Sequence, residues 1–144
     1  MLKILRATDE HFDAMYEIHK QCFEEQMSEA MFLEETQHSS RVYFVAVLEG
    51  SVAAYAGAWN TGEDYCIISI ATHKTFQRQG LAGKLLERLV VDALAKKIKV
   101  LSLEVNTNNK AAIGLYRKMG FIVTNTRKKY YKNGDDAYVM WLYK

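Results

Sequence analysis

Hydrophobic residues follow two different periods along the chain, and this predicts a mixture of strands and helices. Apolar or alternating stretches typical of strands occupy residues 2–5, 41–48, 51–60, 65–72 and 100–105. The dipeptide Glu49-Gly50 separates two of these stretches as a hairpin turn would. Residues 121–131 and 136–143 predict a closing antiparallel hairpin, with its turn at 132–135.

Repeats of three and four residues predict helices at 8–23, 28–36, 81–94 and 108–120. Polar residues that cap helices stand at their starts: Thr8 or Asp9, Ser28 and Asn109. The third helix carries one apolar stripe, formed by Leu81, Leu85, Leu86, Leu89, Val90, Ala93 and Leu94. Gly120 ends the fourth helix.

The order of these elements predicts an α/β fold of one domain, spanning residues 1–144. The nearly continuous apolar run at 65–72 is typical of a central strand, and strand, helix and strand follow one another from 65 to 105. That order favours a right-handed crossover between two parallel strands. We therefore expect a mixed, mostly antiparallel, twisted sheet with one central parallel pair, flanked by about four helices.

The segment "FQRQGLAGKLLERLV", residues 76–90, predicts a binding site for phosphate. Gly80 and Gly83 stand at the entrance of the third helix, where backbone N–H groups lack partners and the helix dipole is positive. Glycine lets a phosphate approach those groups, and Arg78 adds a suitable charge. A tight strand-to-helix turn with a solvated arginine stays open as the alternative from these residues alone.

Composition narrows the classes of function. The chain has 144 residues, is 49% hydrophobic and carries a net charge of +2, which is too weak to favour nucleic acid as a partner. No apolar run approaches the roughly 20 residues of a membrane span, and the N-terminus does not resemble a signal peptide. We expect a cytoplasmic protein. Its four histidines lack the spacing of a metal site, so we expect no metal.

Two motifs resemble those of a known family. "QRQGLA" is similar to the Q/R-x-x-G-x-G/A motif of the GNAT N-acetyltransferases, with Ala82 in the last position. "EVNTNNKAAIGLYRKMGF" resembles the signature E-V-x-x-x-N-x-x-A-I-x-L-Y-x-x-x-G-F of the family's ribosomal-protein-alanine (RimI-type) branch, and "RKKYY" and "DDAYVM" continue the likeness. The resemblance covers residues 65–142 well and the first 60 residues poorly.

The resemblance implies acetyl-CoA as the acetyl donor and a role for each matching residue. Glu104 matches the general base, and Tyr116 matches the acid that protonates the leaving thiolate. Asn109 matches a residue that touches the cofactor. The matching strand edge, which pairs with the pantetheine arm, is formed by Ile70, Ala71 and Thr72. The matching pyrophosphate loop is formed by Arg78, Gln79, Gly80, Leu81, Ala82 and Gly83. The parallel strands 65–72 and 100–105 should splay so that the arm enters between them.

Without the resemblance, plainer interpretations of these residues stay open. Glu104 is a lone carboxylate on a strand of Val and Leu, and a solvated strand end would explain it. Tyr116 shares a helix face with apolar residues, as a core aromatic would. Asn109 is most simply a helix cap, which can also contact a ligand. The segment "RKKYYK" fits a solvated hairpin, a wall of an acceptor channel or a nucleic-acid strip.

Deprotonation energy favours an α-amine as the acceptor. At pH 7, neutralising an α-amino group costs about 1.4 kcal/mol, whereas a lysine costs about 4.6 kcal/mol. The RimI-type resemblance implies the N-terminal alanine of a small-subunit ribosomal protein. This chain departs from the branch, however, since Gln26 and Met27 precede Ser28 where a Pro-Trp is typical. Another protein N-terminus, a small amine, or a non-catalytic acetyl-CoA-binding module stay open, as does a monomer or homodimer.

Overall fold

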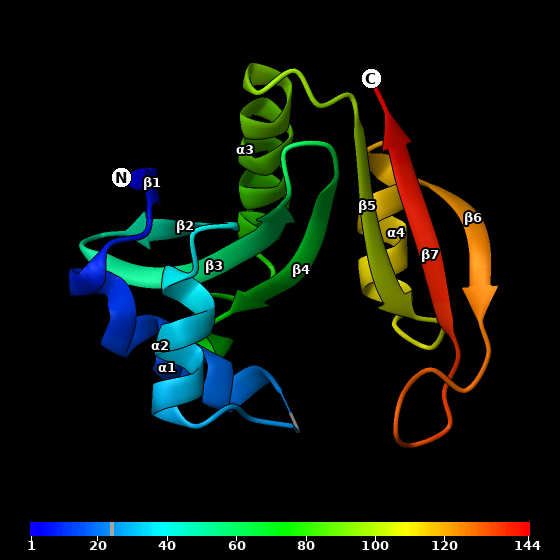
Figure 1. Ribbon diagram of the computed structural model, residues 1–144. Helices are drawn as coiled ribbons and strands as arrows, with labels where there is room; N and C mark the ends of the chain where they lie inside the picture. Colours follow the sequence, from blue (N-terminus) through cyan, green and yellow to red (C-terminus); the bar gives the residue numbers. More distant parts are fainter. Residues whose placement is uncertain (24) are drawn as a thin grey trace.

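The computed structural model describes residues 1–23 and 25–144 (Figure 1). In chain order the elements are β1 (Leu2–Arg6), the 3-10 turn η1 (Asp9–His11), α1 (Phe12–Cys22), α2 (Glu29–Gln37), β2 (Arg41–Leu48), β3 (Ser51–Asn60), β4 (Tyr65–Thr72), the 3-10 turn η2 (Lys74–Phe76), α3 (Leu81–Ala95), β5 (Val100–Asn106), α4 (Lys110–Lys118), β6 (Ile122–Arg127) and β7 (Ala137–Tyr143). The predicted order of strands and helices is confirmed.

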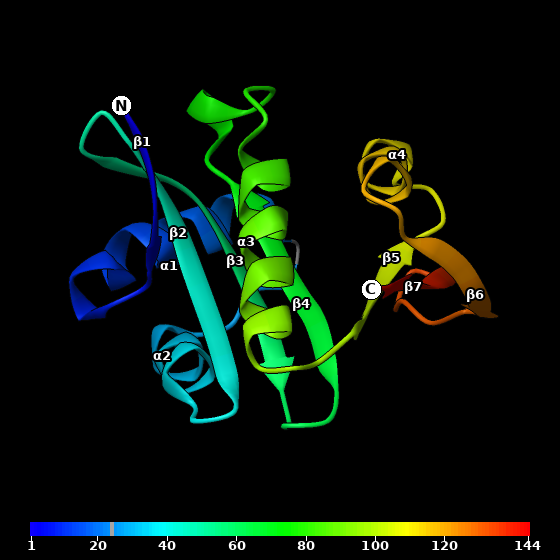
Figure 2. The same cartoon turned by 90° about the horizontal axis from the view of Figure 1, so that it is seen from above.

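Across the described residues the strands form one sheet of order β1-β2-β3-β4-β5-β7-β6. Every neighbouring pair is antiparallel except β4 and β5. Helices α1 and α2 cover one face of the N-terminal strands, and α3 covers the opposite face (Figure 2). The predicted mixed, mostly antiparallel sheet with one parallel pair and four flanking helices is therefore confirmed.

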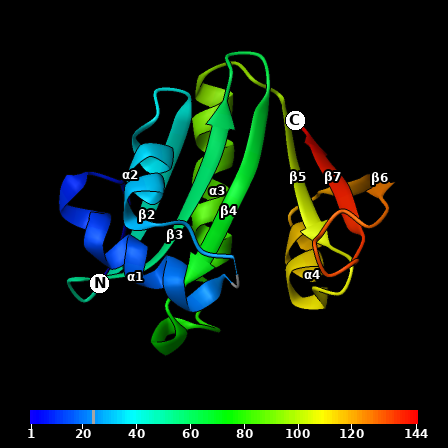
Figure 3. The ribbon, with the colours of Figure 1, turned by 60° about the horizontal axis from the view of Figure 1, so that its bottom comes forward.

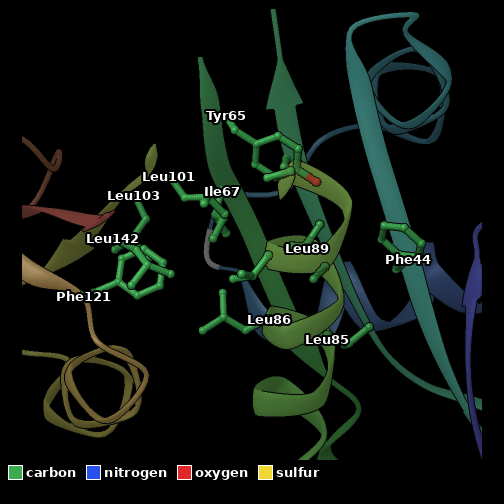
Figure 4. Close-up of a cluster of buried hydrophobic side chains, with 14 of the residues drawn as sticks. Phe44, Tyr65, Ile67, Leu85, Leu86, Leu89, Leu101, Leu103, Phe121 and Leu142 are labelled. Carbon is green, nitrogen blue, oxygen red and sulfur yellow. The ribbon is translucent and has the colours of Figure 1, made fainter. Parts of the chain in front are cut away.

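Two apolar cores hold these layers together. The larger one joins α3 to the sheet, and Figure 4 shows Leu85, Leu86 and Leu89 of that helix among side chains of β4 and β5. The predicted stripe is buried from Leu81 to Ala93, but Leu94 is exposed and does not belong to it. The smaller core lies under α1 and α2, on the other face of the sheet. Residues that alternate along β5 therefore face different sides of the sheet.

The parallel pair splays apart after a short stretch of pairing, as expected. Partners are Tyr65 and Leu101, Cys66 and Ser102, and Ile67 and Leu103, and no further pair joins β4 to β5 among the described residues. The register between β3 and β4 shifts at this level, which leaves Ile68 as an extra residue in β4. Such a bulge bends its strand. Figure 3 shows the C-terminal ends of β4 and β5 lying apart.

The closing hairpin has a longer loop than predicted. The expected strand to residue 131 is wrong, because β6 ends at Arg127 and the turn occupies residues 128–136. The Asp136 carboxylate accepts a hydrogen bond from the Lys129 N–H at 2.9 Å and pairs with the Lys128 ammonium at 3.3 Å. Lys129 has a left-handed φ of 50°, which no strand residue adopts. Polar contacts with a residue several positions later thus end the strand early.

Gly57→Ala should lower the free energy of unfolding by about 2 kcal/mol, because the site is fully packed. An added Cβ would lie 2.7 Å from Cδ1 of the Tyr43 ring and closer to the rest of that edge. The ring is buried, and its hydroxyl donates to Glu35 at 2.9 Å, so it cannot swing aside freely. Urea unfolding measures the loss. Gly114→Ala in α4 is the control: its Cβ meets open space, and we expect a small gain in stability. Equal midpoints for Gly57→Ala and the wild type would contradict the packing argument.

Candidate active site

A cavity of about 280 Å³ lies where β4 and β5 diverge. It is lined by Phe23, Ile67, Ile68, Ser69, Ile70, Leu103, Glu104, Val105, Asn106, Asn109, Tyr116 and Tyr131. Four of the residues singled out in the sequence therefore meet in one place: Ile70, Glu104, Asn109 and Tyr116. Since the neighbours of Glu104 in β5 pack into the core shared with α4, Glu104 and Tyr116 reach the cavity from opposite faces of the sheet.

Glu104 is held by two side chains from the C-terminal hairpin. Its Oε1 accepts a hydrogen bond from the Tyr130 hydroxyl at 3.3 Å. Its Oε2 lies 2.8 Å from Nε of Arg127 as an ion pair. That contact is poorly aligned for a hydrogen bond, so this buried oxygen keeps a lone pair without a donor among the described residues. The carboxylate is 27% exposed and so is neither a freely solvated strand end nor a sealed core group.

Tyr116 carries a partly buried phenol that remains protonated. Its ring packs against Phe121, with 5.9 Å between the ring centres. Burial, and to a smaller extent the neighbouring Tyr131, raises the pKa of Tyr116 to about 12. A group with that pKa keeps its proton throughout the neutral range, and a neutral phenol can donate a hydrogen bond or a proton.

Asn109 caps the N-terminus of α4, as predicted. Its Oδ1 accepts a hydrogen bond from the backbone N–H of Ala112 at 3.2 Å. The same side chain lines the cavity, so the cap and a ligand contact are compatible at this position.

The strand edge of β4 facing away from β3 offers backbone groups beyond the paired stretch. The N–H of His73 donates to Ala53 of β3, and alternation along the strand directs Ala71 to β3 as well. Ile70 and Thr72 then face the diverging side. The Thr72 carbonyl accepts from the thiol of Cys22 at 3.3 Å and from the side chain of Gln77 at 3.4 Å. Ala71 packs its side chain into the core under α1.

The loop before α3 has the backbone of an anion site. Arg78 and Gly80 both adopt left-handed φ values, 65° and 78°. The first bond of the helix runs from Lys84 N–H to the Gly80 carbonyl at 3.2 Å, and Gly80 supplies no side-chain cap. The N–H groups of the first three helical residues, Leu81, Ala82 and Gly83, therefore have no partner within the helix. Such N–H groups suit a phosphate.

Glycine occupies positions 80 and 83 of this loop for two different physical reasons. Gly80 is required by its positive φ, because an added Cβ there would meet open space. Gly83 faces α4 instead, where a Cβ would touch Leu115 at 3.6 Å. The exposed side chains of Arg78 and Gln79 flank the turn. The residues present thus fit a ligand with a phosphate near α3 and an extended arm along β4.

Residues 26 and 27, which precede α2, are held in place by hydrogen bonds with residues of α1. The Met27 N–H donates to Nε2 of His19 at 2.9 Å, and the Tyr16 hydroxyl donates to the Met27 carbonyl at 2.9 Å. Gln26 donates to the Lys20 carbonyl at 2.9 Å. Burial lowers the pKa of His19, which keeps the imidazole neutral and able to accept. Gln26 and Met27 therefore shape this segment through the backbone.

Some residues of the site were missed or left undecided by sequence reasoning. Tyr131 lines the cavity and Tyr130 touches Glu104, so "RKKYYK" contributes to the wall of this site. Lys132 pairs with Glu25 at 3.6 Å, which joins the C-terminal hairpin to the α1–α2 segment. Phe23 and Arg127 carried no signal of their own in the sequence. In the described part of the chain, no cluster of three potential metal ligands is found, and no helix is long and apolar enough to span a membrane.

Comparisons with known proteins bear on the family and the fold of the chain. Residues 12–121 match the acetyltransferase (GNAT) family. A putative [ribosomal protein bS18]-alanine N-acetyltransferase of Bacillus subtilis is 33% identical over 92% of this chain and 89% of its own length. The crystal structure of the ribosomal-protein-S18-alanine N-acetyltransferase from Escherichia coli superimposes with a TM-score of 0.91 at 31% identity, covering 99% of this chain and 94% of that one. A GNAT family acetyltransferase from Elizabethkingia anophelis, solved with acetyl-CoA bound, shares the fold at 20% identity and a TM-score of 0.79, over 99% of this chain and 98% of that one.

Proposed function

The chain belongs to the acetyltransferase (GNAT) family, and on this premise we propose that it acetylates the N-terminal α-amine of a protein. The resemblance of its motifs to that family is confirmed, and the chain is an acyltransferase that uses acetyl-CoA. The names of its relatives make the N-terminal alanine of ribosomal protein bS18 the first acceptor to test. Such an acceptor would place the enzyme in the cytoplasm.

The observation that carries this proposal is that Glu104 and Tyr116 line one cavity. An amine must be neutral to attack a thioester, so a base has to receive its proton, and we assign that role to Glu104. The departing thiolate needs a proton, and we assign the donor role to the protonated Tyr116. A C–N bond forms and the C–S bond breaks, while one proton passes to Glu104 and another leaves Tyr116 for sulfur.

The properties of the two cysteine thiols favour direct transfer of the acetyl group to the amine, without an acyl-enzyme. Burial raises the pKa of Cys66, and it also raises the pKa of Cys22, whose thiol donates to the Thr72 carbonyl. Thiols with raised pKa values are poor nucleophiles at neutral pH, because the thiolate is the reactive form. We therefore propose no acyl-enzyme on either cysteine.

We assign the donor to the diverging edge of β4 and the loop before α3. The backbone groups of Ile70 and Thr72 would bind the extended arm of acetyl-CoA. Ala71 would hold this edge of β4 in place, because its side chain packs into the core under α1. The loop from Arg78 to Gly83 would bind the pyrophosphate through N–H groups and one guanidinium. Asn109 would contact the arm from the start of α4.

Gly80→Ala should raise the KM for acetyl-CoA about tenfold and leave the KM for the acceptor unchanged. A side chain at φ of 78° costs roughly 1–2 kcal/mol, and relaxing that strain would turn the N–H groups away from the phosphate. Steady-state kinetics with each substrate varied in turn measures both constants. Gly62→Ala carries a similar backbone penalty, at φ of 94°, in the turn between β3 and β4. If both variants raise the KM equally, the effect comes from general destabilisation and the assignment of the loop fails.

The direct test is release of the CoA thiol from acetyl-CoA with a panel of acceptors. The panel holds peptides that begin with Ala, Ser or Met, the N-terminal peptide of bS18, free lysine and a polyamine. Turnover on the Ala-starting peptides supports the proposal. Turnover restricted to small amines would keep the chemistry and overturn the acceptor. Binding of acetyl-CoA without turnover on any amine would favour a non-catalytic binding module.

A further inference from the structure

Arg127 forms the ion pair with Glu104, and neither the proposed base nor the proposed acid role explains why a cation should stand there. We propose that Arg127 balances the charge of Glu104, so that the acceptor amine is held in its neutral, reactive form. This inference rests on the proposed function, because it concerns the amine that Glu104 would deprotonate. It makes Arg127 a positioning residue that acts on the reaction through the field at Glu104.

The sheet is built to let Arg127 reach the carboxylate. Arg127 on β6 pairs with Ala137 on β7, and Ala137 pairs with Asn106 on β5, two residues beyond Glu104. The buried alanine between them is small, so the long arginine side chain can cross β7. The guanidinium also lies over the Tyr130 ring, with 5.4 Å from Cζ to the ring centre. Tyr130 in turn donates to the other oxygen of Glu104, so three side chains hold one another in place.

A carboxylate without this partner would work against the reaction. An opposite charge within a few ångströms stabilises the ammonium form of an amine and raises the pKa of that amine. The proton would then be harder to remove. A guanidinium 2.8 Å from Oε2 opposes this field at the amine, so the acceptor would stay closer to its solution pKa near 8. Arginine side chains are not deprotonated in proteins.

The other titratable groups that face Glu104 contribute little charge at neutral pH. They are Cys66 on β4, Tyr116 on α4, and Tyr130 and Tyr131 in the loop after β6. Burial is the main cause that raises the pKa of each, so all four are protonated and neutral at neutral pH. Asp135 is bound to Asn106 and Asn133, and Lys132 is paired with Glu25. Among the described residues, Glu104 forms one ion pair, with Arg127.

The test is the pH dependence of kcat for Arg127→Gln, measured at saturating acceptor peptide and acetyl-CoA. The kcat profile reports groups in the substrate complex, which include the bound amine. We expect its rising limb to move up by about one pH unit, which lowers kcat about tenfold at pH 7 and restores it at alkaline pH. The KM for the acceptor should stay equal or fall, because an unbalanced carboxylate binds an ammonium more tightly.

Two further variants decide between charge balance and mere support of the hairpin. Arg127→Lys keeps the positive charge and should keep the wild-type pH profile. Lys128→Gln removes a charge from the next residue, which is 80% exposed and paired with Asp136, and should change nothing. An equal loss of kcat at every pH in Arg127→Gln, or no change at all, would overturn the proposal. Turnover of the wild type on an α-amine is measured first, so a failure of the proposed function is recognised separately.

Discussion

Glu104→Gln should lower kcat by about 10²–10⁴-fold, because a glutamine cannot accept the proton of the acceptor amine. The substitution keeps the size of the side chain and its position on β5, so the fold and the cavity should remain. Binding of acetyl-CoA should also remain, since we assign the donor to the edge of β4 and the loop before α3. Steady-state rates with an Ala-starting peptide measure the loss, and a direct binding titration with acetyl-CoA separates it from loss of the donor.

Glu87→Gln provides the matched control for this change. Glu87 is an exposed carboxylate on α3, away from the residues that line the cavity, and we expect wild-type kinetics from its amide. The rates of Glu104→Gln and the wild type should be compared over a range of pH, as well as at a single pH. If Glu104→Gln kept wild-type rates between about pH 6 and 9, another group or bulk water would be the base, and the central assignment would be lost.

Much of the fold could be predicted because its signals are local. The period of the stripe from Leu81 to Ala93 identifies α3, and a strand on each side of that helix requires the parallel pair of β4 and β5. Caps such as Ser28 and Asn109 mark helix starts through bonds that span only three residues. The glycines at the entrance of α3 were also recognised from the local pattern, whereas the left-handed φ of Gly80 was not predicted.

The parts that could not be predicted depend on contacts between residues far apart in the chain. The end of β6 is set by Asp136, which binds Lys128 and Lys129 across the loop. The pairing of Arg127 with Glu104 needs the register of three strands and the small side chain of Ala137 between them. The bulge at Ile68 lies where β4 leaves β5, and the apolar run at 65–72 gave no sign of an extra residue. Periodicity cannot report such features, because they depend on register and packing.

The candidate site, like the fold, combines residues that the sequence predicted with an arrangement that it did not predict. Glu104 and Tyr116 were named from a motif, yet their relation to one another could not be derived from spacing, since one lies on a strand and the other on a helix behind it. Only the divergence of β4 and β5 lets both reach one cavity. The position of Met27, before α2, is set by hydrogen bonds of its backbone with the side chains of Tyr16 and His19. Hydrogen bonds to the backbone depend little on the residue type at the bonded position, so the sequence does not reveal them.

Tyr116→Phe should lower kcat by about 10- to 100-fold, a smaller loss than that of Glu104→Gln. A thiol with a pKa near 8.5 is a fair leaving group without help, so removing the proton donor leaves a measurable rate. The ring of the phenylalanine would keep the packing against Phe121, and the cavity should be unchanged. Single-turnover rates with an Ala-starting peptide measure this step apart from product release.

The raised pKa of Tyr116 fixes the sign of its pH dependence. With a pKa of about 12, the phenol loses its proton only in strongly alkaline solution, so the wild type should keep its acid throughout the range in which the amine becomes neutral. The ratio of wild-type to Tyr116→Phe rates should therefore stay constant from about pH 7 to 9. Tyr143→Phe, an exposed phenol on β7, should match the wild type. An acetyl thioester with a more acidic thiol should reduce the ratio of wild-type to Tyr116→Phe rates, because its thiolate leaves without a proton. An unchanged ratio would show that Tyr116 supports the cavity by packing and donates no proton.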